Sequence, residues 1–274
     1  MKKFISAISA SVLAVSALPV VTASAVNHAE ENILSVSAET VSEALTVDET
    51  VIPAGAVAVT VNIADNSGFI STTTKLDLGA YGVISNEKGI PAVVTGNATE
   101  GSLVTGSVNE GVAVFATVGT KEDDTDGSLF TFYVNDDSFD ASAINVSDFE
   151  TVDYADISVS AMSVYSLNNT AGYYKIGDVN NDGYIDSVDA TVTRMAIEEN
   201  GGNKLLVSTA NADLRRFFVE TTVCAQSADP DLSNSITTLD AEDMMIYYSC
   251  AATGKDYSEK SDGHCGEIRY YNGK

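Results

Sequence analysis

Apolar and polar residues alternate with a period of two through the first half of the chain, from about residue 33 to 166. Four apolar sets keep this spacing: Val57, Val59, Val61 and Ile63; Val112, Val114, Ala116 and Val118; Phe130, Phe132 and Val134; and Ile157, Val159 and Ala161. Such alternation is typical of half-buried strands in an antiparallel sheet. Turn signals rich in Gly, Asp and Asn separate the runs, as at 65–68, 86–89 and 123–127. The pattern predicts an all-β, two-sheet sandwich over residues 26–166.

The period becomes helical after a polar break, and residues 167–175 are expected to form a short linker. Helix spacing relates Val188, Val192, Met195 and Ala196, then Leu214, Phe217, Phe218 and Val223 within 211–225, then Leu239, Met244, Ile246, Tyr247 and Cys250. The pattern predicts a small all-α module at 176–256, followed by a tail at 257–274. Three short helices bury little apolar surface, so this module needs additional stabilisation, such as bound metal.

The first 25 residues have the pattern of an export signal. Lys2 and Lys3 precede the mostly apolar stretch 4–21, and Ala23-Ser24-Ala25 supplies the small residues that a signal peptidase needs. The alternative, a membrane anchor, is disfavoured because the apolar stretch is short and acidic residues follow it. We therefore expect a secreted, extracellular protein without membrane insertion, either free or held at the cell surface through a scaffold.

The composition excludes some partners and leaves the cysteine pairing open. The chain has 39 acidic and 14 basic residues, a formal net charge of −25. Such a surface repels nucleic acid and anionic membranes and is compatible with calcium. Export permits a disulfide, but three cysteines leave one thiol unpaired within the chain. Both Cys224–Cys250 and Cys250–Cys265 are possible pairs.

The most specific motif is a twelve-residue segment from Asp178 to Asp189. Oxygen ligands fall at loop positions 1, 3, 5, 7, 9 and 12, where position 7 would offer its backbone carbonyl: Asp178, Asn180, Asp182, Tyr184, Asp186 and Asp189. Gly183 stands at position 6, where the chain must turn sharply. Calcium takes six to eight hard oxygens, and this spacing wraps them around one point. The segment predicts a calcium site, since these carboxylates would otherwise repel each other.

A second copy of this segment begins at Asp229. The same positions hold Asp229, Asp231, Ser233, Ser235, Thr237 and Asp240. Asn234 replaces the glycine, and Asn tolerates the left-handed conformation that the turn requires. With fewer carboxylates this second site should bind calcium more weakly. The alternative is a degenerate loop that closes without metal.

These two loops resemble those of dockerin modules. Each copy ends in Asp and leads into one helix, whereas an ordinary EF-hand loop ends in Glu and follows a helix. The resemblance covers roughly residues 175–252, although the loops start 51 residues apart, further than is usual in that family. It implies calcium-dependent docking to a cohesin of a larger scaffoldin. The implied partner-binding positions are Ser187, Val188, Arg194 and Met195 in the first copy, and Thr238, Leu239, Met245 and Ile246 in the second.

The N-terminal half resembles a cohesin. The segment 51–78 is similar to a cohesin opening with a "GxxVxVxVxI" strand and an "NxxGF" turn, and 127–134 is similar to the "G.LF.F.V" strand. The resemblance implies a jelly-roll sandwich that uses one flat sheet face to hold a dockerin-bearing protein. The competing hypothesis is a carbohydrate-binding sandwich, but Trp, the usual sugar platform, is absent. The aromatic residues of this half fit core roles better: Phe69, Tyr81, Phe115, Phe130, Phe132 and Tyr133.

Catalytic patterns are weak in this sequence. The two histidines, His28 and His264, have no evident catalytic partner, and the acids of 123–126 lie in a turn. We therefore expect a non-catalytic adaptor scaffoldin of a cellulosome-like, polysaccharide-degrading complex. The alternative is a carbohydrate-binding sandwich that the dockerin tethers to such a complex.

Overall fold

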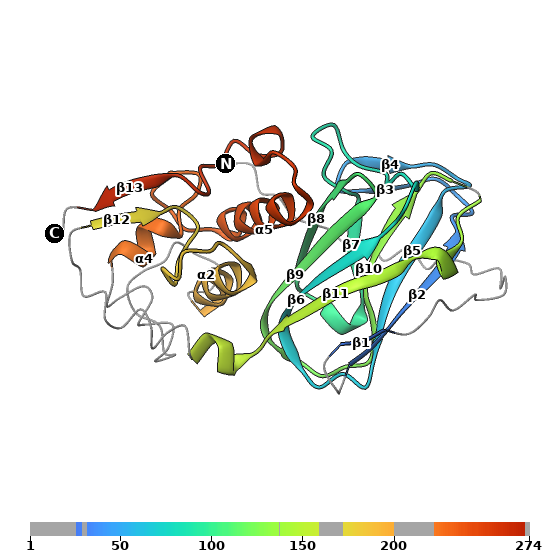
Figure 1. Ribbon diagram of the computed structural model, residues 1–274, viewed down its shortest axis with the longest axis horizontal. Helices are drawn as coiled ribbons and strands as arrows, with labels where there is room; N and C mark the ends of the chain where they lie inside the picture. The colour runs from blue at the N-terminus through green and yellow to red at the C-terminus, as the bar shows by residue number, and fades with distance from the viewer. Residues whose placement is uncertain (1–25, 29–31, 137, 159–171, 200–221, 272–274) are drawn as a thin grey trace.

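The computed structural model describes residues 26–28, 32–136, 138–158, 172–199 and 222–271 (Figure 1). The expected export signal, residues 1–25, lies outside the described residues. A β-sandwich built by the first half of the chain lies beside a smaller helical module built by the second half (Figure 1). Among the described residues, no helix is both long and apolar enough to cross a membrane.

Nine strands form the two layers of the sandwich. The first sheet has the order β1 (Val26–His28), β2 (Asn32–Thr40), β5 (Val57–Ala64), β10 (Gly127–Val134) and β7 (Val93–Thr95). The second sheet has the order β11 (Asn145–Val152), β6 (Phe69–Asp77), β9 (Val112–Asp123) and β8 (Leu103–Asn109). Neighbouring strands are antiparallel throughout. The predicted two-sheet sandwich is therefore confirmed.

Three short elements complete this half. A hairpin pairs β3 (Leu45–Val47) with β4 (Thr50–Ile52), and two 3-10 turns are η1 (Asn97–Thr99) and η2 (Ala141–Ala143).

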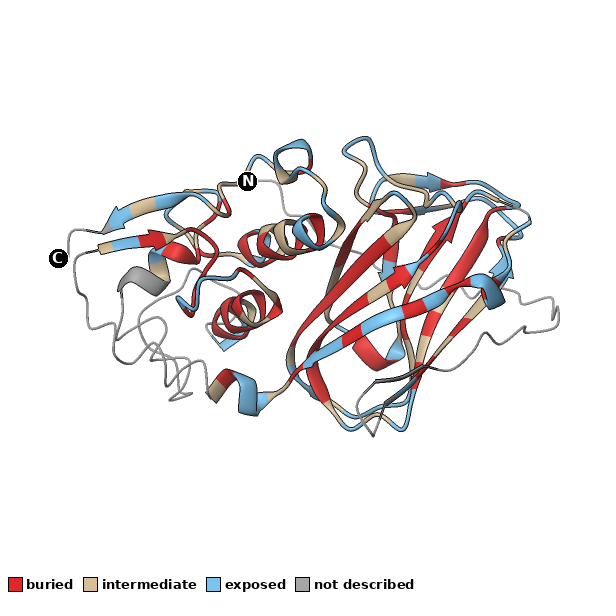
Figure 2. Cartoon of the chain, in the orientation of Figure 1, coloured by how far each residue is buried: buried red, intermediate tan, exposed pale blue. Residues whose placement is uncertain are grey.

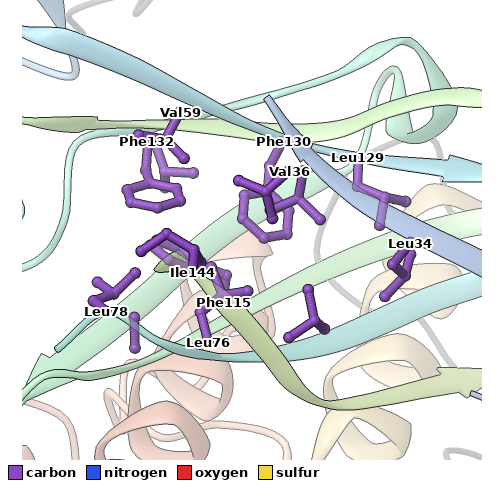
Figure 3. Close-up of a cluster of buried hydrophobic side chains, with 14 of the residues drawn as sticks. Leu34, Val36, Val59, Leu76, Leu78, Phe115, Leu129, Phe130, Phe132 and Ile144 are labelled. Carbon is purple, nitrogen blue, oxygen red and sulfur yellow. The ribbon is translucent and has the colours of Figure 1, made fainter. Parts of the chain in front are cut away.

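The sandwich core lies between the sheets and is aromatic at its centre (Figure 3). The ring of Phe115 on β9 lies 4.9 Å, centroid to centroid, from the rings of both Phe130 and Phe132 on β10. The predicted inward set of β5, from Val57 to Ile63, also joins this core. Strand alternation explains the arrangement, because every second side chain of β5 and β10 points to the same layer.

Strand β9 is buried on both of its faces. Ala113 and Phe115 point into the sandwich core, whereas Ala116 and Val118 belong to a second apolar cluster that includes the helices. The set predicted from Val112 to Val118 does share one face, but that face points toward the helical module and away from the sandwich core.

The strand predicted at Ile157, Val159 and Ala161 is wrong at Ile157, the one of these residues that the structure describes. Residues 154–158 are helical, and 159–161 lie outside the described residues. The reason is a helix cap: Oδ1 of Asp153 accepts hydrogen bonds from the backbone N–H groups of Ala155 and Asp156, at 2.6 and 3.0 Å. These bonds satisfy helix-start donors, and Ile157 is buried all the same.

The C-terminal half contains helices α2 (Ser187–Glu199), α4 (Thr222–Ser227) and α5 (Thr238–Thr253), and the 3-10 turn η3 (Tyr257–Glu259). It also contains a two-stranded ribbon, β12 (Gly172–Lys175) with β13 (Ile268–Tyr271). The expected helix at 211–225 lies outside the described residues, apart from the start of α4.

The ribbon lies outside the predicted all-α module at 176–256, where the described elements α2, α4 and α5 are helices. Strand β12 takes up the last four residues of the expected linker 167–175, and β13 lies in the expected tail 257–274. The physical reason is pairing between distant segments. Ile176 donates a backbone hydrogen bond to Glu267, at 2.9 Å, and Cys265 is buried beside Gly177.

Neither of the two disulfides considered above is formed. Cys250 and Cys265 are both free and both buried.

Candidate calcium loops and docking face

The first candidate calcium loop is closed by hydrogen bonds to its own carboxylates. Asp178 accepts from the backbone N–H groups of Asp182 and Gly183, both at 3.0 Å. Asp189 reaches back across the loop and accepts from Val179 at 2.7 Å. Gly183 adopts a φ of 98°, a conformation that favours glycine, at the position where the sequence requires a sharp turn.

Three carboxylates of this loop are buried or half-buried and lie near other carboxylates, whereas Asp182 is exposed. Burial is the main cause that raises the pKa of Asp178, to about 6, and it raises the pKa of Asp189 well above its ordinary value. Burial also raises the pKa of Asp186. Nearby carboxylates add to each of these shifts. Ionised carboxylates held this way need a cation, so the donor set fits a hard divalent ion.

Two other predicted ligands of the first loop, Asn180 and Tyr184, lie where each can still offer an oxygen to an ion in the loop. Asn180 is buried, and its amide donates to Oδ2 of Asp182 at 2.9 Å. The side chain of Tyr184 is 73% exposed, so its phenol points into solvent and only its backbone carbonyl remains as a candidate ligand.

The second loop brings three carboxylates together. Oxygens of Asp229, Asp231 and Asp240 lie within 4.8 Å of one another. Oδ1 of Asp240 is buried and has no hydrogen-bond partner within the described part of the chain, and burial raises the pKa of this carboxyl to about 7. A buried acceptor without a partner is costly, and a cation among the three carboxylates would satisfy it. This second loop therefore also fits calcium.

The hydroxyl groups of the second loop make internal hydrogen bonds. The Ser233 hydroxyl donates to the Ser235 carbonyl at 3.1 Å. Thr237 is the N-cap of α5: its hydroxyl accepts from Leu239 at 3.2 Å and lies beside Asp240. These bonds fix the loop directly against the start of the helix.

The two loops lead directly into the two helices that contact the sandwich. Helix α2 packs against β9, β6 and β11, and helix α5 packs against β8 and β9 (Figure 1). Helix α2 and strands β6 and β9 are largely buried, whereas helix α5 and strand β11 mix buried and exposed residues (Figure 2). We call the outer side of the sheet β11-β6-β9-β8 the docking face. Its residues include Ser71, Thr73, Thr105, Ser107, Val114, Ala116 and Val118.

Polar bonds cross this contact at several points. A hydrogen bond of 2.6 Å joins the hydroxyls of Ser71 and Thr191, and the Thr253 hydroxyl donates to that of Ser107 at 3.0 Å. The Arg194 guanidinium donates to the backbone carbonyls of Gly101 and Val118. Three further bonds are Tyr248 to Glu150, Asn109 to the Thr253 carbonyl, and Lys255 to the Val108 carbonyl, at 3.1, 3.0 and 2.8 Å.

The predicted partner-binding residues divide into two groups. Met195 and Met245 join the apolar cluster that connects the helices to Val118 and Val152, and Val188 packs against its edge. Arg194 makes the contacts just described, while Ser187 and Ile246 are buried. Thr238 and Leu239 are exposed, Leu239 by 62%. The structure thus brings four of the eight, Val188, Arg194, Met195 and Met245, to the contact with the chain's own sandwich.

The sequence interpretation missed the sandwich side of this contact and the helix residues Thr191, Tyr248 and Thr253. One signal was present. Residues 112–118 form a nearly continuous apolar run, and such runs are typical of strands buried on both faces.

Comparisons with known proteins add little. No family model matches the chain, and no curated protein matches it. Among solved structures, the chain is similar to a non-cellulosomal cohesin from the hyperthermophilic archaeon Archaeoglobus fulgidus. The identity is 19%, the match covers 36% of this chain and 69% of that chain, and the TM-score is 0.28. A likeness this low carries no argument about this chain.

Proposed function

We propose that this protein is a secreted, non-catalytic adaptor scaffoldin of a cellulosome-like, polysaccharide-degrading complex. Its dockerin-like module would hold two calcium ions and dock to a cohesin of a larger scaffoldin. Its cohesin-like, jelly-roll sandwich would receive a dockerin-bearing protein on the docking face.

One observation carries the proposal: two loops of the same spacing place carboxylates at the start of two helices, and in the second loop three carboxylates lie within 4.8 Å of one another. Asp189 stands in the first turn of α2 and Asp240 in the first turn of α5. Ions held there would fix the positions of both helices, and with them the side chains that meet another surface. A protein-docking role follows because the loops would fix two helices relative to each other, and such a pair of helices can present side chains to another protein.

The sandwich supports the same role through its docking face. This face is broad and lined by small side chains, so helices can approach its backbone closely. The competing carbohydrate-binding role is less well supported. Five aromatic residues of this half are buried, namely Phe69, Phe115, Phe130, Phe132 and Tyr133, and Tyr81 packs against Phe139. None of these six forms an open platform for a sugar ring.

Calcium uptake by the full mature chain tests the foundation of the proposal. Calorimetric titration should detect two sites in the wild type and one fewer in Asp178→Ala or in Asp229→Ala. Immobilised full chain is then incubated with cohesin-bearing and dockerin-bearing proteins, in calcium and in chelator. Calcium-dependent capture of either class supports docking. Absence of calcium uptake, or retention on insoluble polysaccharide with capture of neither class, would overturn it.

A further inference from the structure

The helical module covers the docking face, outside the core that lies between the two sheets. The core between the two sheets is complete in itself and contains all three central phenylalanines. The cluster that joins Ala116 and Val118 to the helices is separate from that core. The helical module therefore does not complete the fold of the sandwich; it occupies a surface of it.

The chemistry of this contact is that of an interface between separable parts. Small hydroxyl residues, Ser71, Thr73, Thr105 and Ser107, line much of the docking face. The Thr105 hydroxyl is buried and finds no hydrogen-bond partner among the described residues. Water would satisfy that hydroxyl whenever the face opens.

The module side of the contact depends on the calcium loops. Thr191 and Arg194 lie on α2, a short distance beyond the first loop, and Tyr248 and Thr253 lie on α5, which the second loop precedes. All four meet the sandwich by hydrogen bonds. Loss of the ions would destabilise the first turns of both helices. It would therefore disturb the contacts that α2 and α5 make with the sandwich.

We infer that the occupant of the docking face is this chain's own helical module, held there while its loops carry calcium and released when they do not. The protein is closed on itself in calcium, and each half blocks the surface by which the other would dock elsewhere. This inference rests on the proposed function, since it assigns the partner of the same surfaces.

A cut between the halves tests the inference in the full chain. A protease site is placed within residues 159–171, and the purified protein is cut and run on a sizing column. In calcium the two pieces are expected to elute together as one species, and in chelator they are expected to separate. Pieces that separate in calcium, or that stay together in chelator, would overturn the inference. An assembly of two copies in calcium would also overturn it, because the occupant would then be a second chain.

A matched pair of substitutions locates the contact. Thr73→Arg places a bulky charge on the docking face, and Thr131→Arg places the same side chain on the outer face of the opposite sheet. After cutting, Thr73→Arg should separate in calcium while Thr131→Arg should still elute as one species. Equal behaviour of the two variants would contradict the assignment. The cut wild type needs no substitution, so the inference remains testable if a variant does not fold.

Different results would contradict the proposed function and the self-occupied docking face. If the wild type takes up no calcium, the proposed function fails. If it takes up calcium normally but its pieces separate in calcium, only the self-occupied docking face fails.

Discussion

Individual side chains of the two loops have unequal tasks. Asp178 is buried and accepts two backbone hydrogen bonds, while the Ser233 hydroxyl is exposed and donates to a neighbouring carbonyl. We expect Asp178→Ala to weaken calcium binding at its loop by on the order of tenfold or more, because a charged ligand is lost. Ser233→Ala should have a much smaller effect. Calorimetric titration of both variants measures the two losses of calcium affinity. A larger loss in Ser233→Ala than in Asp178→Ala would contradict this ranking.

The same carboxylates predict an unusual dependence of stability on pH. Burial raises the pKa of Asp178 to about 6 and that of Asp240 to about 7 in the metal-free protein. The folded state then binds protons more tightly than the unfolded state, so the free energy of unfolding falls as pH rises from about 4 through these pKa values.

Metal-free protein should therefore melt at a higher temperature at about pH 5 than at about pH 8. Excess calcium should reverse that order, because only the ionised carboxylates bind it. Thermal melts in chelator and in calcium at both pH values measure this. The same pH trend in both conditions would count against calcium at these loops.

The residue scale is also where the sequence was most informative. Loop spacing alone placed Asp229, Asp231 and Asp240 together, and the structure does bring them within one site. The use of Thr237 as a helix cap was not foreseen, since a hydroxyl at that position suits a ligand and a cap equally well.

At the scale of elements, calcium should control the helices. Helices α2 and α5 both begin with a carboxylate that has other carboxylates nearby, and mutual repulsion of unneutralised carboxylates opposes those starts. We expect the far-ultraviolet circular dichroism of the full chain to lose helical signal in chelator and to regain it when calcium is restored. The β-sheet signal should change little, because the sandwich core is separate. A spectrum unchanged by chelator would contradict metal-coupled folding.

Elements were predictable where a local period dominates. The alternation of Val57, Val59, Val61 and Ile63 identified β5 correctly, because one face of that strand is buried. The same alternation misled at Ile157, where an Asp153 cap starts a helix. The ribbon β12–β13 was missed because its strands are almost a hundred positions apart and short, so no local pattern marks their pairing.

At the scale of the whole molecule, the contact between the halves was beyond sequence reasoning. Each half looked like a module with a free surface, and nothing local states that the two surfaces fit each other. The long-range bonds show it: Ser71 meets Thr191, and Ser107 meets Thr253, across more than a hundred positions. Under the proposed function, the protein must therefore open before it can bridge two other proteins.

Arg194 offers the sharpest test of this coupling between the halves. Its guanidinium is partly buried and donates to the carbonyls of Gly101 and Val118, so it links α2 directly to the sandwich. Hydrogen bonds from a charged group contribute about 1.5–3 kcal/mol in buried settings, and the half-buried position favours the lower end. In calcium the wild type should unfold in one calorimetric transition, because the contact couples both halves. Arg194→Ala should weaken that coupling and split or broaden the transition.

The matched control is Arg269→Ala, which removes a half-exposed arginine of strand β13 that pairs with the exposed Glu267. Exposed pairs contribute little, so the single transition should persist in that variant. In chelator the wild-type transition should shrink to that of the sandwich alone, since the loosened helical module no longer melts together with it. If Arg194→Ala and Arg269→Ala melt alike, and the wild type shows the same transition with the same enthalpy in calcium and in chelator, the two halves form one permanent unit.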